Sequence, residues 1–128
     1  MSGSLGASRR VVAIVPELLL ATRIAATAQQ VEVGLTIADG QHGLEVCRSV
    51  KPDLIVLDLE ALPDPVPLIR ALKSDPFTSR VPLVGFYPHV RNALRAAAIG
   101  AGADRVLPRS AFIARLGELL AGEAGTPE

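Results

Sequence analysis

The chain is poor in the residue types that build disulfide scaffolds and aromatic binding surfaces. It has one cysteine, one tyrosine, three phenylalanines and no tryptophan, so an internal disulfide is excluded and bases have no aromatic platform on which to stack. Thirteen basic residues balance thirteen acidic ones, and this neutrality removes the field that draws proteins to polyanions. We therefore expect no nucleic-acid partner and a core built from aliphatic side chains.

Long hydrophobic runs are also missing. The first apolar run, residues 11–15, is far too short for a membrane span or for the core of a signal peptide, so we expect a cytoplasmic protein without a membrane partner. The length of 128 residues fits one domain, which we place at residues 9–121 between flexible segments at residues 1–8 and 122–128. Within it, Cys47 is predicted to be a small core residue.

Segments typical of strands alternate with segments typical of helices. We expect strands at residues 11–15, 31–37, 54–58, 81–87 and 105–107. We expect helices at residues 18–30, 41–50, 67–73, 90–100 and 111–121, the last one capped by Ser110. Such alternation with short links produces a parallel sheet with helices on both faces. The sequence therefore predicts an α/β fold, a single doubly wound five-stranded parallel sheet flanked by five helices.

Asp58 ends the segment predicted to be the central strand. Residues 54–57 are continuously apolar, which is typical of a strand that is covered by helices on both faces. Open α/β sheets carry their chemistry at the carboxyl ends of their strands. Asp58 is therefore a candidate site residue, and the alternative is a carboxylate that caps the following loop.

Two segments, IADGQHGLEVCRSVKPDLIVLDL and GAGADRVLPR, resemble the receiver domain of bacterial two-component response regulators. The resemblance covers residues 9–121 and implies a flavodoxin-like fold. It also implies that Asp58 matches the aspartate that accepts a phosphoryl group from a histidine kinase. Receivers further use an acidic pair after the first strand to hold magnesium, a Ser or Thr after the fourth strand and a Lys after the fifth. These groups offset the negative charge that phosphoryl transfer brings together.

The acidic pair is incomplete in this chain. Pro16 and Glu17 stand at its two positions, so one carboxylate remains. Magnesium, with Glu17, Asp58 and the backbone carbonyl of Glu60 as ligands, is expected to bind weakly at best, because a hard cation in octahedral geometry loses an anchoring oxygen. The alternative role of Glu17 is to stabilise the first turn of the following helix through the helix dipole.

The switch and lysine positions also differ. Tyr87 stands where the small hydroxyl belongs, and we expect its ring to cover Asp58 or to fill the vacant pocket, with a partly exposed aromatic as the alternative. Arg109 stands at the lysine position and can grip a carboxylate with two parallel hydrogen bonds, so we expect a permanent ion pair between Arg109 and Asp58. The resemblance is thus to a degenerate, atypical receiver, or pseudo-receiver.

A basic surface is predicted in the second half of the chain. Its candidate residues are Arg91, Arg95, Arg105 and Arg115. In receivers the surface formed by the fourth helix, fifth strand and fifth helix commonly binds partners, so the resemblance implies a docking face for a protein or for a homodimer. The alternative is an ordinary solvated surface. His42 and His89 are interpreted as helix-start and loop residues, because no metal-ligating neighbour has the right spacing.

Three functional hypotheses follow. The first is a stand-alone pseudo-receiver, a non-enzymatic protein-protein interaction module of phosphorelay signal transduction that binds a signalling protein or histidine kinase independently of phosphorylation. The second is a functional single-domain response regulator phosphorylated on Asp58. The third is a small-molecule-binding α/β protein whose pocket is bounded by Asp58, Tyr87, His89 and Arg109, although no nucleophile and base pair supports it. None of the three requires a cofactor other than weakly bound magnesium.

Overall fold

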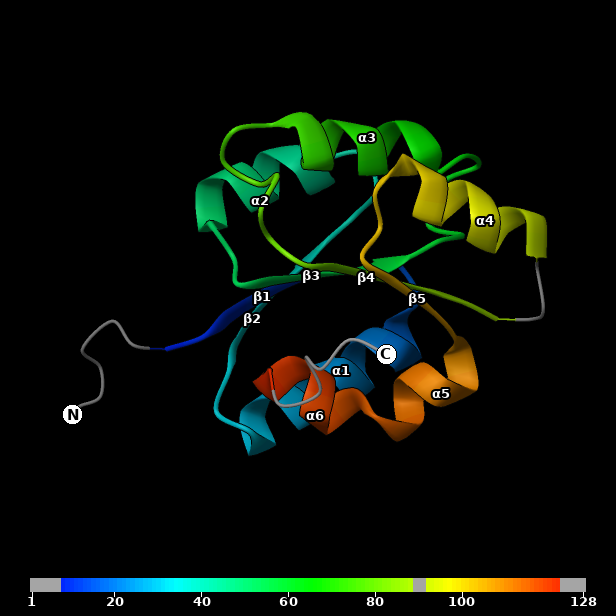
Figure 1. Ribbon diagram of the computed structural model, residues 1–128. Helices are drawn as coiled ribbons and strands as arrows, with labels where there is room; N and C mark the ends of the chain where they lie inside the picture. Colours follow the sequence, from blue (N-terminus) through cyan, green and yellow to red (C-terminus); the bar gives the residue numbers. More distant parts are fainter. Residues whose placement is uncertain (1–7, 89–91, 123–128) are drawn as a thin grey trace.

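A computed structural model describes residues 8–88 and 92–122, and it contains one five-stranded parallel sheet with helices on both faces (Figure 1). The strands are β1 (Arg10–Ile14), β2 (Gly34–Ala38), β3 (Leu54–Asp58), β4 (Leu83–Tyr87) and β5 (Arg105–Pro108). The helices are α1 (Leu18–Gln30), α2 (Gly43–Val50), α3 (Val66–Ser74), α4 (Asn92–Ala101), α5 (Arg109–Ala114) and α6 (Leu116–Ala121). The predicted fold class is confirmed. Within the described ranges, no helix is long and apolar enough to cross a membrane.

The order of the strands fixes where a site can form. The sheet runs β2-β1-β3-β4-β5, so the chain moves from β1 outward to β2 and then returns to the other side of β1 as β3. The loops that leave β1 and β3 therefore diverge toward opposite faces of the sheet, and a crevice opens at the carboxyl ends of these strands. Asp58 is the last residue of β3, and Glu17 follows β1 closely, so the topology brings both to this edge.

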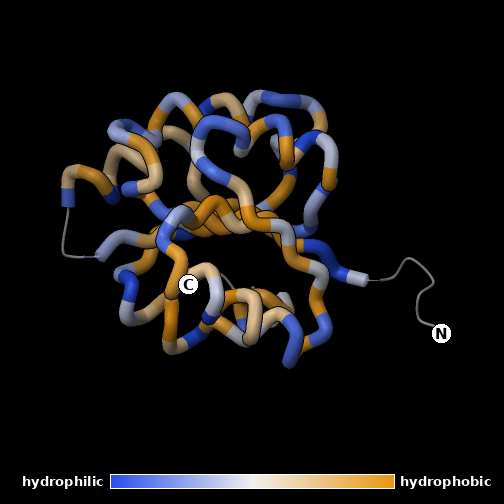
Figure 2. The backbone as a smooth tube through the Cα atoms, turned by 180° about the vertical axis from the view of Figure 1, so that it is seen from behind, coloured by the Kyte–Doolittle hydropathy of each residue, from blue (hydrophilic) through white to orange (hydrophobic). Residues whose placement is uncertain are grey.

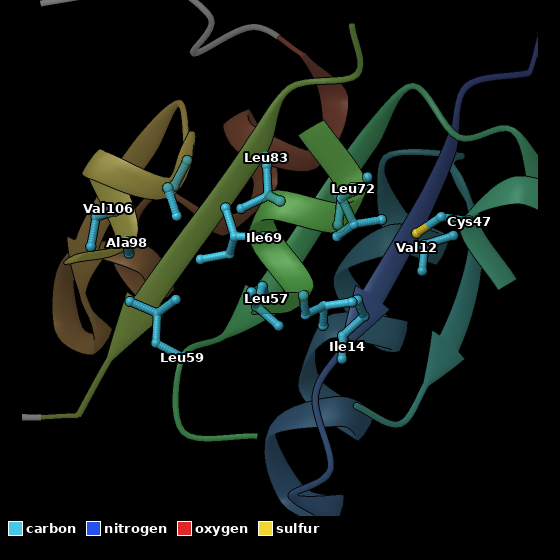
Figure 3. Packing of buried hydrophobic residues seen from close by; sticks show 14 of the residues in the cluster. Val12, Ile14, Cys47, Leu57, Leu59, Ile69, Leu72, Leu83, Ala98 and Val106 are labelled. Carbon is cyan, nitrogen blue, oxygen red and sulfur yellow. The ribbon is translucent and has the colours of Figure 1, made fainter. Parts of the chain in front are cut away.

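The core consists of two clusters, one on each face of the sheet. Alternate residues of β1 supply them: Val11 and Ala13 belong to the cluster under α1 and α6, whereas Val12 and Ile14 belong to the cluster under α2, α3 and α4. Figure 2 shows the hydrophobic residues concentrated in the central strands. Figure 3 shows the second cluster, in which Cys47 is fully buried beside Val12, as predicted.

Two contacts fix the α6 side of the molecule. The rings of Phe86 on β4 and Phe112 on α5 stack with centroids 4.4 Å apart, a geometry that adds to the free energy of burial. The Arg9 guanidinium donates a hydrogen bond from Nε to the carbonyl oxygen of Leu120 at 2.7 Å, which joins the start of β1 to the end of α6. The first and last described elements are therefore held together.

The predicted count of five helices is wrong, because the last helix is divided. It begins at Arg109 rather than at residue 111 and breaks at Arg115, whose φ of −110° and ψ of 15° leave the helical region. Hydrogen bonds reach across the break, from the Arg115 N–H to the Ala111 carbonyl and from the Leu119 N–H to the Arg115 carbonyl. The break is a change of direction that hydrophobic spacing does not reveal. Ser110 lies inside α5 and does not cap it.

The predicted second strand, residues 31–37, starts too early. Val31 donates its N–H back to the Thr27 carbonyl as the cap of α1, and Glu32 has a φ of 62° in the left-handed region. The strand therefore begins only at Gly34. The alternating pattern of residues 31–33 is typical of a strand, but these residues form the turn that ends α1 and leads into β2.

Candidate functional site

Asp58 lies half-buried at the carboxyl end of β3. Its Oδ1 accepts a hydrogen bond from the Glu60 N–H at 2.9 Å, and its carbonyl oxygen accepts one from the Ala61 N–H at 2.8 Å. The carboxylate therefore caps the β3–α3 loop, which is the alternative role that the sequence leaves open. The same contacts hold Asp58 at the edge where a phosphoacceptor would stand.

The surroundings of Asp58 disfavour negative charge. Burial is the largest cause and raises the pKa of its carboxyl group above the ordinary value; the hydrogen bond from the Glu60 N–H opposes this rise. Among the neighbouring charges, those of Glu60 and Glu17 raise the pKa and that of Arg109 lowers it. Phosphorylation would replace the single charge of the carboxylate with the about 1.5 to 2 negative charges of a phosphoryl group. The described side chains provide one positive charge against two negative neighbours.

The predicted ion pair between Arg109 and Asp58 is wrong, because Arg109 pairs with Glu17 instead. Its Nη2 donates a hydrogen bond to Glu17 Oε1 at 2.8 Å, which joins the start of α5 to the residue before α1. Glu17 carries one more methylene than an aspartate, and its side chain is 43 % exposed, so the guanidinium meets it with only partial desolvation. On Asp58, Arg109 acts as a nearby positive charge. An ion pair this exposed contributes about 0 to 1 kcal/mol.

The predicted magnesium ligands make an incomplete donor set. Glu17 already binds a guanidinium, and Asp58 binds a backbone N–H of its own loop. Pro16, at the first position of the expected acidic pair, has no side-chain oxygen. Among the residues that the structure describes, no group of three or more His, Cys, Asp or Glu side chains is placed to hold a metal ion. A magnesium ion would have to separate Glu17 from Arg109 and recruit water in place of the missing carboxylate.

Tyr87 is buried, with 6 % of its surface exposed, so its interpretation as a partly exposed aromatic is wrong. It belongs to the cluster under α2, α3 and α4 together with Leu59 and Ala98, and its Cα is the register partner of Pro108 on β5. The phenol ring therefore fills space inside the molecule at the position where receivers carry a small hydroxyl. The sequence could have predicted this burial of Tyr87, because side chains alternate along a strand and Leu83, four residues earlier on β4, belongs to the same cluster.

The residues of the predicted basic face are spread over α4, the start of β5 and the junction of α5 with α6 rather than gathered into one cluster; Figure 1 shows these elements. Arg95 is exposed on α4, Arg105 begins β5 at its amino end, and Arg115 separates α5 from α6. The Nε of Arg115 lies 3.5 Å from Glu118 Oε1. Arg91 lies outside the described residues.

Two features escape the sequence analysis. His42, which directly precedes α2 as predicted, has its Nδ1 2.9 Å from Asp39 Oδ1; this pairing raises the pKa of His42 and lowers that of Asp39. Spacing of three residues across a turn is the signal that could have suggested the pair.

The second feature is a shallow hollow at the opposite, amino edge of the sheet. It is lined by Glu45, Arg48, Ser49, Lys51 and Phe77. The pocket of the third hypothesis would lie elsewhere, and its His89 lies outside the described residues.

Comparison with known proteins gives structural neighbours only. No protein-family model matches the chain, and no curated protein matches its sequence. A response regulator from Hahella chejuensis superimposes with a TM-score of 0.81 at 20 % identity, over 94 % of this chain and 98 % of that one. The chemotaxis response regulator CheY4 of Vibrio cholerae gives 0.78 at 16 % identity, over 91 % and 98 %.

A third neighbour was solved with a magnesium ion coordinated in its active-site cleft. It is the receiver domain of the sensor histidine kinase PA1611 from Pseudomonas aeruginosa PAO1, with a TM-score of 0.75 at 20 % identity, over 91 % of this chain and 99 % of that one. The match to these neighbours extends along nearly their whole length. The chain therefore has the fold of a response regulator receiver domain, flavodoxin-like in topology.

Proposed function

We propose that the chain is a pseudo-receiver, a non-enzymatic signalling module that acts in the cytoplasm by binding a protein partner and does not depend on phosphorylation. The observation that carries the proposal is the pairing of Glu17 with Arg109 beside a half-buried Asp58. The residue that would anchor a metal and the residue that would neutralise a phosphoryl group are bound to each other. Asp58 is left with little to offset added negative charge.

Phosphoryl transfer to Asp58 would meet three obstacles in this arrangement. Its carboxyl group already has a raised pKa, so even the single charge of the carboxylate is disfavoured. The charge of Arg109 is partly offset by Glu17 at 2.8 Å. Tyr87, buried in the core, offers no small hydroxyl that could move onto a phosphoryl oxygen. Stabilising such a transition state requires prearranged positive charge, which is scarce here.

The basic face is the surface we assign to the partner. Arg95 is an exposed positive residue of this face, so a two-fold pairing centred on it would oppose like charges. An acidic surface of a signalling protein, such as a histidine kinase, suits it better. Reversing the charge of Arg95, which is exposed on α4, should reduce partner capture, whereas Asp58→Ala should leave it unchanged.

Intact mass spectrometry after incubation with acetyl phosphate and magnesium tests the proposal. The wild-type chain should gain no stoichiometric phosphoryl group. A variant that carries Pro16→Asp, Tyr87→Thr and Arg109→Lys restores the receiver pattern and should gain one, and the same variant with Asp58→Ala should not. Stoichiometric phosphorylation of the wild type would refute the proposal and favour the second candidate, a functional response regulator that is phosphorylated on Asp58.

One observation favours that second candidate. The ion pair between Glu17 and Arg109 is only half-buried, with side chains 43 % and 36 % exposed. Breaking it would cost about 1 kcal/mol at most, which lowers magnesium affinity by about fivefold. The missing carboxylate at Pro16 is therefore the larger obstacle to a metal. A magnesium titration of the Pro16→Asp variant, followed by NMR, separates the effect of the missing carboxylate on magnesium affinity from that of the ion pair between Glu17 and Arg109.

A further inference from the structure

The outward side of α1 is exposed and largely apolar from residue 18 to residue 26, and the exposed Gln29 and Gln30 follow at the end of the helix. Leu18 and Leu19 are 76 % and 78 % exposed, more than the other large hydrophobic residues that the structure describes as exposed. Three exposed residues with small, uncharged side chains follow them on the same side of the helix: Thr22, Ala25 and Ala26. Arg23 is the single charged residue among the 13 of α1. A solvated helix normally presents a charged or polar outer face, so this surface resembles an interface.

The spacing of these residues is symmetric about Thr22. Leu18 and Leu19 precede Thr22 by four and three residues, and Ala25 and Ala26 follow it by three and four. Positions three and four apart are neighbours on a helix surface, so Thr22 has a leucine pair on one side and an alanine pair on the other. The face thus has a large end and a small end with a residue of intermediate size between them.

Such a face fits a second copy of itself in antiparallel orientation. A two-fold axis at Thr22 sets the leucine pair of each copy against the alanine pair of the other, so that large side chains fill the space above small ones. The positive end of each helix dipole also lies near the negative end of the other. The size pattern and the dipoles both favour this one orientation.

A threonine is compatible with the axis of this arrangement. Inside a helix its hydroxyl can donate to the carbonyl four residues earlier, as the Thr27 hydroxyl does to the Arg23 carbonyl at 3.0 Å. A threonine that satisfies its hydroxyl in this way leaves its methyl group for packing. Thr22 therefore brings no charge to the axis, and its side chain is short enough for two helices to approach each other.

We propose that two copies of this chain associate through α1 in this antiparallel arrangement. The helix α1 contacts β2, which is the edge strand of the sheet opposite to β5. Ile37, on the strand β2 that contacts α1, is a further exposed apolar residue, with 42 % of its surface exposed. This inference goes beyond the proposed signalling role, and it does not depend on whether Asp58 is phosphorylated.

The size of the surface sets the expected affinity. A helix of 13 residues is about 20 Å long and presents a face about 10 Å wide, so two copies bury well under the roughly 1,600 Å² of a standard stable interface. Interfaces of this class are weak and transient. We expect dissociation constants in the range of about 10 µM to 1 mM, and the measurements must cover that range.

Disulfide cross-linking locates the axis. The native Cys47 is fully buried, and burial raises the pKa of its thiol to about 12, so it does not compete. In the proposed dimer, Thr22→Cys places two thiols at the axis, and oxidation should give a covalent dimer. Ala26→Cys is the matched control, because its two copies lie about 12 Å apart along the helix axis, beyond disulfide reach. Ala96→Cys on the exposed face of α4 tests the other candidate dimer surface.

Sedimentation equilibrium of the full chain supplies the second measurement. Thr22→Glu brings two carboxylates together at the axis and should weaken association at least tenfold, while circular dichroism remains that of the wild type. Ala96→Glu, which adds the same charge to an exposed helical position elsewhere, should leave association unchanged. A wild type that is monomeric up to about 1 mM, or cross-linking that is equal at positions 22 and 26 or stronger at position 96, would overturn the proposal.

Discussion

Replacing Tyr87 with threonine places the small hydroxyl of receivers at the end of β4 and at the same time removes a buried ring. The structure predicts that this substitution destabilises the protein, even though it moves the sequence closer to the receiver pattern. The reason is that the ring fills the cluster it shares with Leu59 and Ala98 and is only 6 % exposed.

The size of the effect follows from buried area. A buried aromatic side chain removes about 150–250 Å² from water, and at about 25 cal/mol per Å² this corresponds to about 4–6 kcal/mol. Threonine retains the β-carbon and one methyl group and introduces a hydroxyl that is partly desolvated. The net loss in the free energy of unfolding should therefore be about 2–4 kcal/mol, comparable to other large-to-small substitutions in cores. A domain of ordinary stability remains folded after such a loss.

Urea unfolding followed by circular dichroism measures this loss directly. Tyr87→Phe is the matched control: it keeps the ring and removes only the hydroxyl, so the change should stay below about 1 kcal/mol. A loss below about 1 kcal/mol for Tyr87→Thr would refute the conclusion that the ring carries core packing. Equal losses for the two variants would show that the hydroxyl, and not the ring, matters.

Three further predictions concern charged groups. Because burial raises the pKa of Asp58, its contribution to stability is present below the unfolded pKa of about 4 and is lost as pH rises through the folded pKa. Asp58→Asn should therefore be more stable than the wild type at pH 7 in urea unfolding, and the difference should vanish in acid. A variant that is less stable than the wild type at pH 7 would contradict this. Asp104→Ala removes the acceptor of the Leu83 N–H at 2.8 Å and should cost about 1–3 kcal/mol in urea unfolding, whereas a cost near zero would show that water replaces the carboxylate. Because Asp39 raises the pKa of His42, the stability from this pair is complete below the unfolded His pKa and is lost as pH rises through the folded pKa. An NMR titration should therefore find a lower His42 pKa in the Asp39→Asn variant than in the wild type. An unchanged His42 pKa would exclude the contact in solution.

The sequence was sufficient where one physical signal dominated. The bounds of β3 were predicted correctly, because residues 54–57 are continuously apolar and no helical pattern competes with them. The bounds of α1 were also correct. The break at Arg115 could not be predicted, since the apolar spacing continues unchanged from Phe112 through Leu116 to Leu119. Such a bend depends on how α5 and α6 each pack against the sheet and α1, which is tertiary information.

The site was predictable in position but not in its contacts. Asp58 and Glu17 reach the same edge because they follow adjacent parallel strands, which the alternation of elements already implied. The predicted partner of Arg109, Asp58, was wrong, because the choice between two nearby carboxylates depends on how deeply each is buried. Glu17 is the more exposed and the longer, so pairing with it requires less desolvation.

The hydrogen bond from Arg9 to the Leu120 carbonyl has a practical consequence. In a parallel sheet every strand starts at the same edge, so the beginning of β1 and the end of α6 meet at the edge remote from Asp58. A fluorophore or affinity tag attached before β1 or after α6 would consequently depart from the far side of the molecule. Reporter fusions can therefore be built at both ends of the domain while the carboxyl edge of the sheet stays accessible to phosphodonors and metal ions.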